Sequence, residues 1–272
     1  MKKIDIHCHT TNRLLENTID KKANIKTILK KMKKHNIETT YILPTYFAHK
    51  GSGITNFRLL NWINKHSELK MFGSLDFEHY FYQGINEIKE LANLKKISGI
   101  KIYTGYQNID FSSEKFKKII NIANNFSLPL MFHTGFVHGG REKYKDKISE
   151  RIIDIMKLEP TIKKNPNLTF ILSHMGKPHL NKTISLIQKY KNVYTDMSGL
   201  IDSKYEQHEI PRIINKIKKF LKEIGPNKLL FGTDFPVQTY EDSIRFIEES
   251  TKDFPLDYKK KIYYGNARKI LK

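Results

Sequence analysis

The sequence predicts an α/β protein with the (β/α)8 or TIM-barrel fold, in a single domain over residues 1–272. Short apolar segments alternate with amphipathic helical segments, and each unit covers roughly 30 residues, the length of a β-α-β unit. The short segments are almost continuously apolar, which is typical of parallel strands that helices cover on both sides. No glycine-rich nucleotide-binding motif follows the first segment, so the sequence favours a barrel over an open doubly wound sheet.

Eight predicted strands follow one another in order, with helices between them. The strands cover residues 4–9, 37–43, 71–75, 99–103, 128–133, 168–174, 192–196 and 228–234. The helices are recognised from apolar residues three or four positions apart, which line one face of a helix. These residues are Ile25, Ile28, Leu29 and Met32; Phe57, Leu60 and Ile63; Ile85, Ile88 and Leu91; Phe116, Ile119, Ile120 and Ala123; Ile152, Ile153 and Met156; Leu180, Ile184 and Ile187; and Ile213, Ile217 and Leu221.

The composition indicates a soluble enzyme-sized domain. Hydrophobic residues make up 39% of the chain, which is enough for a buried core. No apolar run approaches the roughly 18 residues of a membrane-spanning helix, and no signal-like segment opens the chain. We therefore expect a cytoplasmic protein. The one cysteine, Cys8, excludes an internal disulfide and a multi-cysteine zinc site.

The formal net charge of +20 is the unusual feature of the composition. Such a charge is compatible with a polyanionic partner. The lysines, however, occur in runs at residues 30–34, 216–219 and 259–261, interleaved with apolar residues as on the solvated faces of surface helices. We therefore expect a small-molecule substrate and neither a nucleic acid nor a membrane as partner, and we leave homo-oligomerisation open.

The first strand ends in a histidine pair. Because side chains alternate along a strand, His7 and His9 lie on one face and Cys8 on the other. Two imidazoles on one face form half of a metal site. In a (β/α)8 barrel the active site lies at the carboxyl ends of the strands. Later strands carry or end in further reactive residues, namely Lys101, His133, His174 and Asp234.

Seven motifs resemble those of a known family. They are IDIHCH at 4–9, GIKIY at 99–103, FHTG at 132–135, FILSHMG at 170–176, NVYTD at 192–196, LFGTDFP at 230–236 and GNAR at 265–268. With them the chain resembles, nearly end to end, the amidohydrolase superfamily, in particular the amidohydrolase-related group (amidohydrolase 2). That group includes metal-dependent hydrolases and enzymes of the aminocarboxymuconate-semialdehyde decarboxylase type.

The resemblance implies a metal site and an acid–base residue. His7, His9, His133 and Asp234 would hold a divalent metal, usually zinc, and His174 would be catalytic. Three neutral imidazoles and one carboxylate suit zinc and leave an open position for water or substrate. Bound zinc lowers the pKa of water from 15.7 to about 7. Asp234 would accept a proton from that water, and His174 would polarise the substrate carbonyl or shuttle the proton.

Two further residues are predicted to bind substrate. By strand alternation Lys101 faces the barrel interior, where an ammonium group needs a partner, so we expect it to bind a carboxylate of the protein or the substrate. Some superfamily members carboxylate a lysine at this strand and hold two metals. We favour one zinc per chain, with manganese or a second metal as alternatives. Arg141, in the loop after the fifth strand, could bind a substrate carboxylate with two hydrogen bonds.

Other polar residues near the strand ends have weaker signals. His138, Lys177 and His179 lie in the loops after the fifth and sixth strands and could also face the substrate. Asp196 ends the seventh strand, and we expect it to be structural. Asp5 shares the inward face of the first strand but lies deeper, so we expect a structural hydrogen-bonding role.

The leading functional hypothesis is a metal-dependent hydrolase that uses metal-activated water on a small amide, ester or lactone. The alternative is a metal-dependent non-oxidative decarboxylase of an unsaturated or aromatic carboxylic acid. Some aromatic-acid decarboxylases of the family carry glutamate at the position of His7, so the histidine favours hydrolysis. A phosphodiesterase or DNase ranks lower, because the DNases of the superfamily generally carry glutamate where this chain has Lys101. A barrel that binds without catalysis is the remaining alternative.

Overall fold

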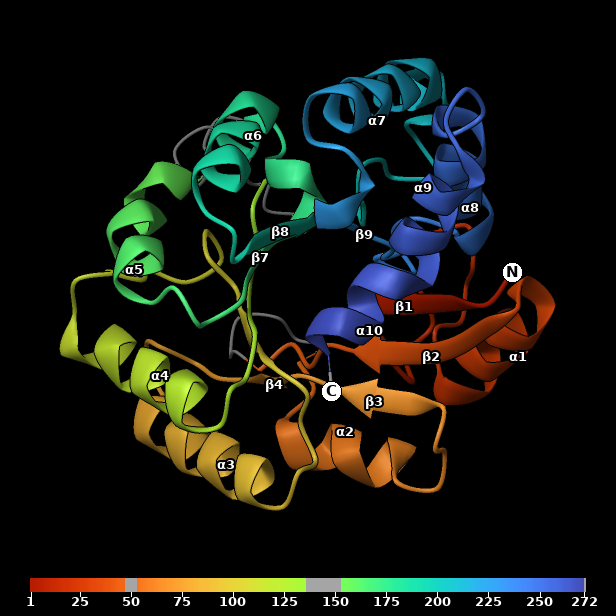
Figure 1. Cartoon of the computed structure of the whole chain (residues 1–272). Helices are drawn as coiled ribbons and strands as arrows, with labels where there is room; N and C mark the ends of the chain where they lie inside the picture. The colour runs from red at the N-terminus through yellow and green to blue at the C-terminus, as the bar shows by residue number, and fades with distance from the viewer. Residues whose placement is uncertain (47–52, 136–152, 272) are drawn as a thin grey trace.

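The computed structural model describes residues 1–46, 53–135 and 153–271. Parallel strands lie at the centre and helices surround them (Figure 1), so the predicted (β/α)8 barrel fold is confirmed. The strands are β1 Lys3–Cys8, β2 Ile37–Ile42, β3 Leu69–Met71, β4 Gly73–Ser74, β5 Ile100–Ile102, β6 Leu130–Phe132, β7 Phe170–Leu172, β8 Val193–Asp196 and β9 Leu229–Leu230. Each of the eight predicted strands therefore has a counterpart in the structure.

The third predicted strand is divided in two. Phe72 lies between β3 and β4, and the strands form two sheets, ordered β1-β2-β3 and β4-β5-β6-β7-β8-β9. The Phe72 amide donates to the carbonyl oxygen of Ile42 at 3.2 Å, whereas the Gly73 amide donates to the carbonyl oxygen of Gly99 at 2.9 Å. The chain thus passes from one neighbouring strand to the other within two residues.

The strand ladder is also interrupted between β9 and β1, but backbone hydrogen bonds cross this seam. The Ile6 amide donates to the Phe231 carbonyl at 3.1 Å, and the His9 amide donates to the Phe235 carbonyl at 2.8 Å. A Cβ atom on Gly232 would lie 2.9 Å from the Cβ of His7, so only glycine permits this close approach. The segment after β9 therefore runs directly beside β1.

Helices lie at or beside the apolar stripes identified in the sequence, and α8, α9 and α10 were not predicted. They are α1 Ile25–His35, α2 Asn56–Ile63, α3 Phe81–Asn93, α4 Glu114–Asn125, α5 Glu159–Lys164, α6 Leu180–Lys189, α7 Ile210–Ile224, α8 Tyr240–Ser250, α9 Leu256–Lys260 and α10 Asn266–Ile270. Side chains of Asn24, Thr55, Ser113 and Thr239 accept backbone hydrogen bonds as N-caps of α1, α2, α4 and α8. Within the described residues, no helix is both long and apolar enough to span a membrane.

One helical prediction is only partly met. The stripe of Ile152, Ile153 and Met156 predicts a helix, but Ile152 lies outside the described residues and Ile153 precedes the first helical turn. A 3-10 turn covers Ile155–Leu158, and α5 follows directly. Pro160 lies in the first turn of α5, where a proline favours the start of a helix.

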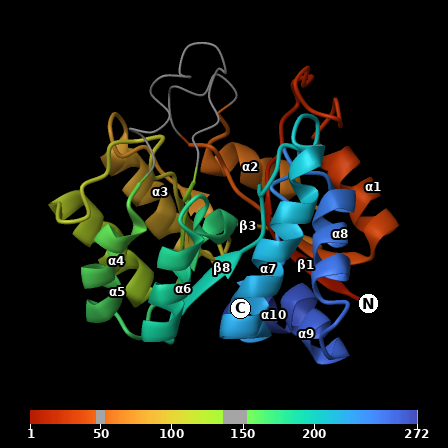
Figure 2. The ribbon, with the colours of Figure 1, turned by 90° about the horizontal axis from the view of Figure 1, so that it is seen from above.

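The core has an inner and an outer part. Met131 and Ile171 pack inside the barrel with Phe72, whereas Leu130 and Phe132 pack between the strands and the helices. Lys101 is aligned with Met131 in the register of β5 and β6, so its side chain also faces the interior. Figure 2 shows both chain termini toward the lower end of the barrel, the end at which β1 begins. The carboxyl ends of the strands lie at the opposite end.

Phe72→Ala tests the inner core. The Phe72 side chain is fully buried, so we expect the free energy of unfolding to fall by about 3–5 kcal/mol, measured by urea denaturation. Phe57 is 40% exposed, and Phe57→Ala is the control, with an expected change within about 0.5 kcal/mol. Equal losses for the two variants would contradict the packing described here.

Candidate active site

His7, His9 and Asp234 meet at the carboxyl end of the barrel. Oδ1 of Asp234 lies 3.3 Å from Nε2 of His7 and 3.2 Å from Nε2 of His9. Ligand atoms of these three residues all lie within 4.8 Å of one another. The seam between β1 and the segment after β9 produces this meeting, because the Asp234 amide donates to the His7 carbonyl at 2.7 Å.

This donor set fits a divalent metal. Nδ1 of His9 lies 3.1 Å from the carbonyl oxygen of Leu43, which can only accept a hydrogen bond, so the proton of this ring is on Nδ1. Its Nε2 lone pair then points toward Asp234. Two imidazole nitrogens and one carboxylate oxygen are the ligand types that zinc and similar metals prefer.

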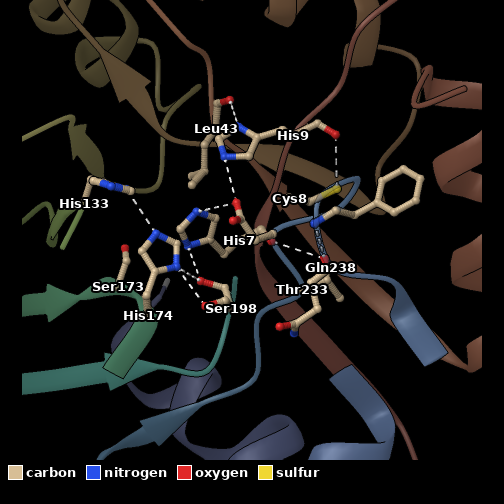
Figure 3. A network of polar contacts seen from close by, with 12 residues as sticks. His7, Cys8, His9, Leu43, His133, Ser173, His174, Ser198, Thr233 and Gln238 are labelled. Carbon is tan, nitrogen blue, oxygen red and sulfur yellow. Dashed lines mark hydrogen bonds and ion pairs between the residues drawn. The ribbon is translucent and has the colours of Figure 1, made fainter. Parts of the chain in front are cut away.

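His174 and His133 form the second part of the site. Nε2 of His174 lies 3.1 Å from Nδ1 of His133, and the His174 ring centre is 5.1 Å from that of His7. Figure 3 shows His174 between His133 and Ser198. Among the described residues, two groups of potential metal ligands lie at this end of the barrel: His7 with His9 and Asp234, and His7 with His174 and Asp196. His133 belongs to neither group. Its role as the fourth ligand stays a prediction.

The backbone at His174 is unusual. His174, Met175 and Gly176 have φ angles of 60°, 52° and 69°. Residues other than glycine rarely adopt this left-handed conformation, and where they do the surrounding structure must hold them. The His174 amide donates to Oδ1 of Asp196 at 2.9 Å, which is one such restraint.

Asp196 and Ser198 join the site from the end of β8. Oδ2 of Asp196 lies 2.9 Å from Nδ1 of His7. The Ser198 hydroxyl lies 2.8 Å from the same Nδ1 and 3.1 Å from Nδ1 of His174. The sequence pattern predicted only a structural role for Asp196 and no role for Ser198. Their two-residue spacing at a strand end, which places both side chains on one face, was the available signal.

Burial and charge set the protonation of the metal-facing groups. Burial, followed by the positive charge of Lys101, lowers the pKa of His7 to about 3. Burial raises the pKa of Asp234, but the contact with His9 and the neighbouring imidazoles outweigh burial and hold that pKa well below its ordinary value. A neutral imidazole and an ionised carboxylate are the forms that bind a metal. Burial also lowers the pKa of His174.

Lys101 lies beside the histidines. It is fully buried, and its Nζ donates to the Ser173 hydroxyl at 3.0 Å and lies 3.5 Å from Nε2 of His7. Nζ also lies 5.4 Å from the ring centre of Tyr103. The structure therefore places the Lys101 side chain beside the histidine cluster, and its role in substrate binding stays a prediction.

Asp5 fastens the strand seam below the site. Its carboxylate accepts hydrogen bonds from the His7 amide at 3.1 Å and from the amide and hydroxyl of Thr233 at 3.0 and 2.8 Å. Burial raises the pKa of Asp5 to about 7, against the opposing effect of these hydrogen bonds. The carboxylate links β1 to the segment after β9 and contacts no imidazole ring in these hydrogen bonds, in keeping with the structural role expected for it.

The other predicted residues are less central. Arg141 and His138 lie outside the described residues. Nζ of Lys177 donates to the Leu200 carbonyl at 2.9 Å, and His179 is exposed at the start of α6. These contacts place neither Lys177 nor His179 in the histidine cluster.

Gly199, which no sequence motif identified, also lies against the site. It has a φ of +55°, and a Cβ atom there would lie 2.4 Å from Oδ2 of Asp234 and 2.9 Å from Nδ1 of His174. A side chain at this position would displace both site residues. Glycine is therefore required by the conformation and by the close approach of the backbone to the site.

A cavity of about 830 Å³ lies away from these residues. Its lining includes Lys70, Lys95, Lys96 and Lys269 and none of the predicted site residues. It also includes Asn64, Ala92 and Phe126, which lie at the carboxyl ends of α2, α3 and α4.

Comparison with known proteins identifies the class. A barrel with histidines and an aspartate at its carboxyl end is typical of metal-dependent enzymes. The family model for amidohydrolases matches residues 4–272, and the chain therefore belongs to the amidohydrolase family of enzymes. The resemblance identified in the sequence is confirmed. No curated protein matches the chain in the corresponding search.

Several solved structures share the fold. A probable 2-pyrone-4,6-dicarboxylic acid hydrolase from Acinetobacter baumannii has 16% identity and a TM-score of 0.68, covering 99% of both chains. A 2,6-dihydroxybenzoate decarboxylase from Rhizobium has 16% identity and a TM-score of 0.69, covering 99% of this chain and 98% of the other. A dihydroxybenzoic acid decarboxylase from Polaromonas sp. JS666, with bound manganese, has 14% identity and a TM-score of 0.70, with coverage of 99% and 96%.

Gly199→Ala tests the geometry of the site. We expect zinc affinity to fall by at least about tenfold, because the added methyl group displaces Asp234 and His174. Competition with a chromophoric chelator measures the affinity. Gly225→Ala is the matched control, since Gly225 has a φ of +79° but no atom within 4 Å of an added Cβ. Equal zinc affinities in the two variants would contradict the proposed contact.

Proposed function

We propose that this enzyme is a metal-dependent hydrolase of a small amide, ester or lactone. The proposal rests on one observation: potential metal ligands from distant parts of the sequence, His7, His9 and Asp234, lie close together. Membership of the amidohydrolase family supports it. His174, on the other side of His7, supplies a group for proton transfer.

We assign the metal to His7, His9 and Asp234, with His133 as the fourth ligand. One zinc ion per chain fits this donor set, and manganese is the alternative, since a similar structure contains it. When bound, the metal supplies a Lewis acid and lowers the pKa of water. Asp5 and Asp196 hold the first strand and the His7 ring in place for this ligand set.

The proton transfers fall to two residues. Asp234 is ionised, so its carboxylate accepts a proton from the attacking water and returns it to the leaving group. His174 is neutral, and we assign to it polarisation of the substrate carbonyl or transfer of a proton. Lys101 stabilises a carboxylate of the substrate or the negative oxygen that develops during attack.

Decarboxylation is the second candidate. The buried cation of Lys101 favours a substrate that carries a carboxylate, and two of the similar structures are decarboxylases of dihydroxybenzoates. A lactone that bears carboxylates would satisfy the same cation, as the similarity to a 2-pyrone-4,6-dicarboxylic acid hydrolase illustrates. The two reactions differ in product, because hydrolysis adds water and decarboxylation releases carbon dioxide.

Metal analysis tests the ligand assignment. We expect close to one zinc or manganese ion per chain in purified protein, and we expect His9→Ala to lose most of it because one of the three converging ligands is removed. Inductively coupled plasma mass spectrometry measures the content. Protein without metal after growth in supplemented medium would refute the assignment.

A substrate screen tests the reaction. The metal-loaded enzyme is incubated with lactones, amides, esters and unsaturated or aromatic acids. We expect acid formation from a lactone, ester or amide, and we expect Asp234→Asn to lower the rate by at least about 100-fold, because its carboxylate accepts the proton. Release of carbon dioxide with no hydrolytic product would instead establish the decarboxylase.

A further inference from the structure

Asp196 contacts two parts of the active site at once. Its side chain is fully buried. Oδ2 lies 2.9 Å from Nδ1 of His7, while Oδ1 accepts hydrogen bonds from the His174 amide at 2.9 Å, the Ser198 amide at 3.1 Å and the Ser198 hydroxyl at 2.5 Å. One carboxylate thus receives donors from β1, from the segment after β7 and from its own strand end.

The positions of the protons in this network follow from which atoms can donate a hydrogen bond and which can only accept one. Three donors converge on Oδ1 of Asp196, so its carboxylate acts as an acceptor in this network. The single hydroxyl proton of Ser198 goes to Oδ1. The Ser198 oxygen can then only accept from the two imidazole nitrogens beside it, Nδ1 of His7 at 2.8 Å and Nδ1 of His174 at 3.1 Å.

A second acceptor gives the same result for His174. Its Nδ1 lies 2.8 Å from the carbonyl oxygen of Ser198, which also cannot donate. Both His7 and His174 therefore carry their proton on Nδ1 and present a lone pair on Nε2. The opposite tautomer of His7 would direct its Nδ1 lone pair at Asp196 Oδ2 and Ser198 Oγ, at 2.9 and 2.8 Å, in exchange for a longer donation from Nε2 to Oδ1 of Asp234 at 3.3 Å.

The same reasoning gives the tautomer of a third ring, that of His133. Because Nε2 of His174 is an acceptor, Nδ1 of His133, 3.1 Å away, must be the donor. Nε2 of His133 then carries no proton in the neutral ring. Figure 3 shows this path from Ser198 through His174 to His133.

We propose that Asp196 is a positioning residue that fixes the proton on Nδ1 of His7 directly and, together with Ser198, orders the protons of His174 and His133. The Nε2 lone pairs of His7 and His133 are thereby directed toward the predicted metal site. The assignment of the tautomers follows from the hydrogen bonds alone. The effect on metal binding rests on the proposed function. A carboxylate behind a metal-binding histidine raises ligand basicity and fixes the ring, and loss of such a partner typically lowers metal affinity 10–100-fold.

Asp196→Asn tests the proposal with little change in shape. Three donors converge on Oδ1, so the amide oxygen must occupy that position and the NH₂ group must face Nδ1 of His7. A donor there requires Nδ1 of His7 to be an acceptor, which moves the ring proton to Nε2. We expect two-bond ¹H–¹⁵N NMR spectra of the metal-free protein to show His7 changing from the Nδ1-H to the Nε2-H tautomer.

Zinc affinity is the second measurement. We expect Asp196→Asn to bind zinc about 10–100-fold more weakly than the unaltered protein in chelator competition. Asp242→Asn is the matched control, because Asp242 is also buried but its carboxylate bonds the Ser203 hydroxyl and the Gln207 side chain, away from the histidines. It should retain the Nδ1-H tautomer and a zinc affinity within about threefold of the unaltered protein.

Different results would refute the role of Asp196 and the proposed function. An Nδ1-H tautomer for His7 in Asp196→Asn, with unchanged zinc affinity, would overturn the proposal. If this variant does not fold, the unaltered protein decides, because an Nε2-H tautomer for its His7 or His174 rings overturns the proposal directly. A protein that shows the expected tautomers but hydrolyses no substrate would refute the proposed function and leave the role of Asp196 intact.

Discussion

The site depends on the backbone hydrogen bonds between β1 and the segment after β9. His7 and Asp234 are far apart in sequence, yet the Asp234 amide donates to the His7 carbonyl at 2.7 Å. Gly232 permits this approach, and Asp5 reinforces it from below through Thr233. The contacts at this seam therefore place the carboxylate beside the two histidines, so the packing of the barrel and the geometry of the candidate metal site depend on the same hydrogen bonds.

Such a site must satisfy many buried polar groups. Lys101, Asp196 and Ser198 are fully buried, and His7 is almost so. An isolated charge in this environment would cost several kcal/mol, which opposes folding unless hydrogen bonds and opposite charges offset it. The Ser198 hydroxyl serves this need twice, since it donates to Asp196 and accepts from the imidazoles. The barrel end is thus a connected polar network rather than a set of separate catalytic residues.

The sequence predicted the fold because the alternation of side chains along a strand and the spacing of apolar residues along a helix are both local properties of the chain. The alternation around Lys101 predicted its inward direction, and the strand ends predicted where His7, His9 and Asp234 would lie. The division of the third strand at Phe72 depends on which neighbour each amide bonds, and no local pattern records that. Gly199 was equally invisible, because its importance comes from contact with two residues that are distant in sequence.

The position of His133 illustrates how structure refines a ligand prediction. Its Nδ1 is engaged with His174, so only Nε2 can serve a metal. The predicted ligand role and the observed hydrogen bond use different nitrogens and are therefore compatible. A metal on Nε2 would also make the Nδ1 proton a better donor, which strengthens the bond to His174 and opposes protonation of that ring at Nε2. In this arrangement the occupancy of the metal site and the basicity of His174 are coupled through one hydrogen bond.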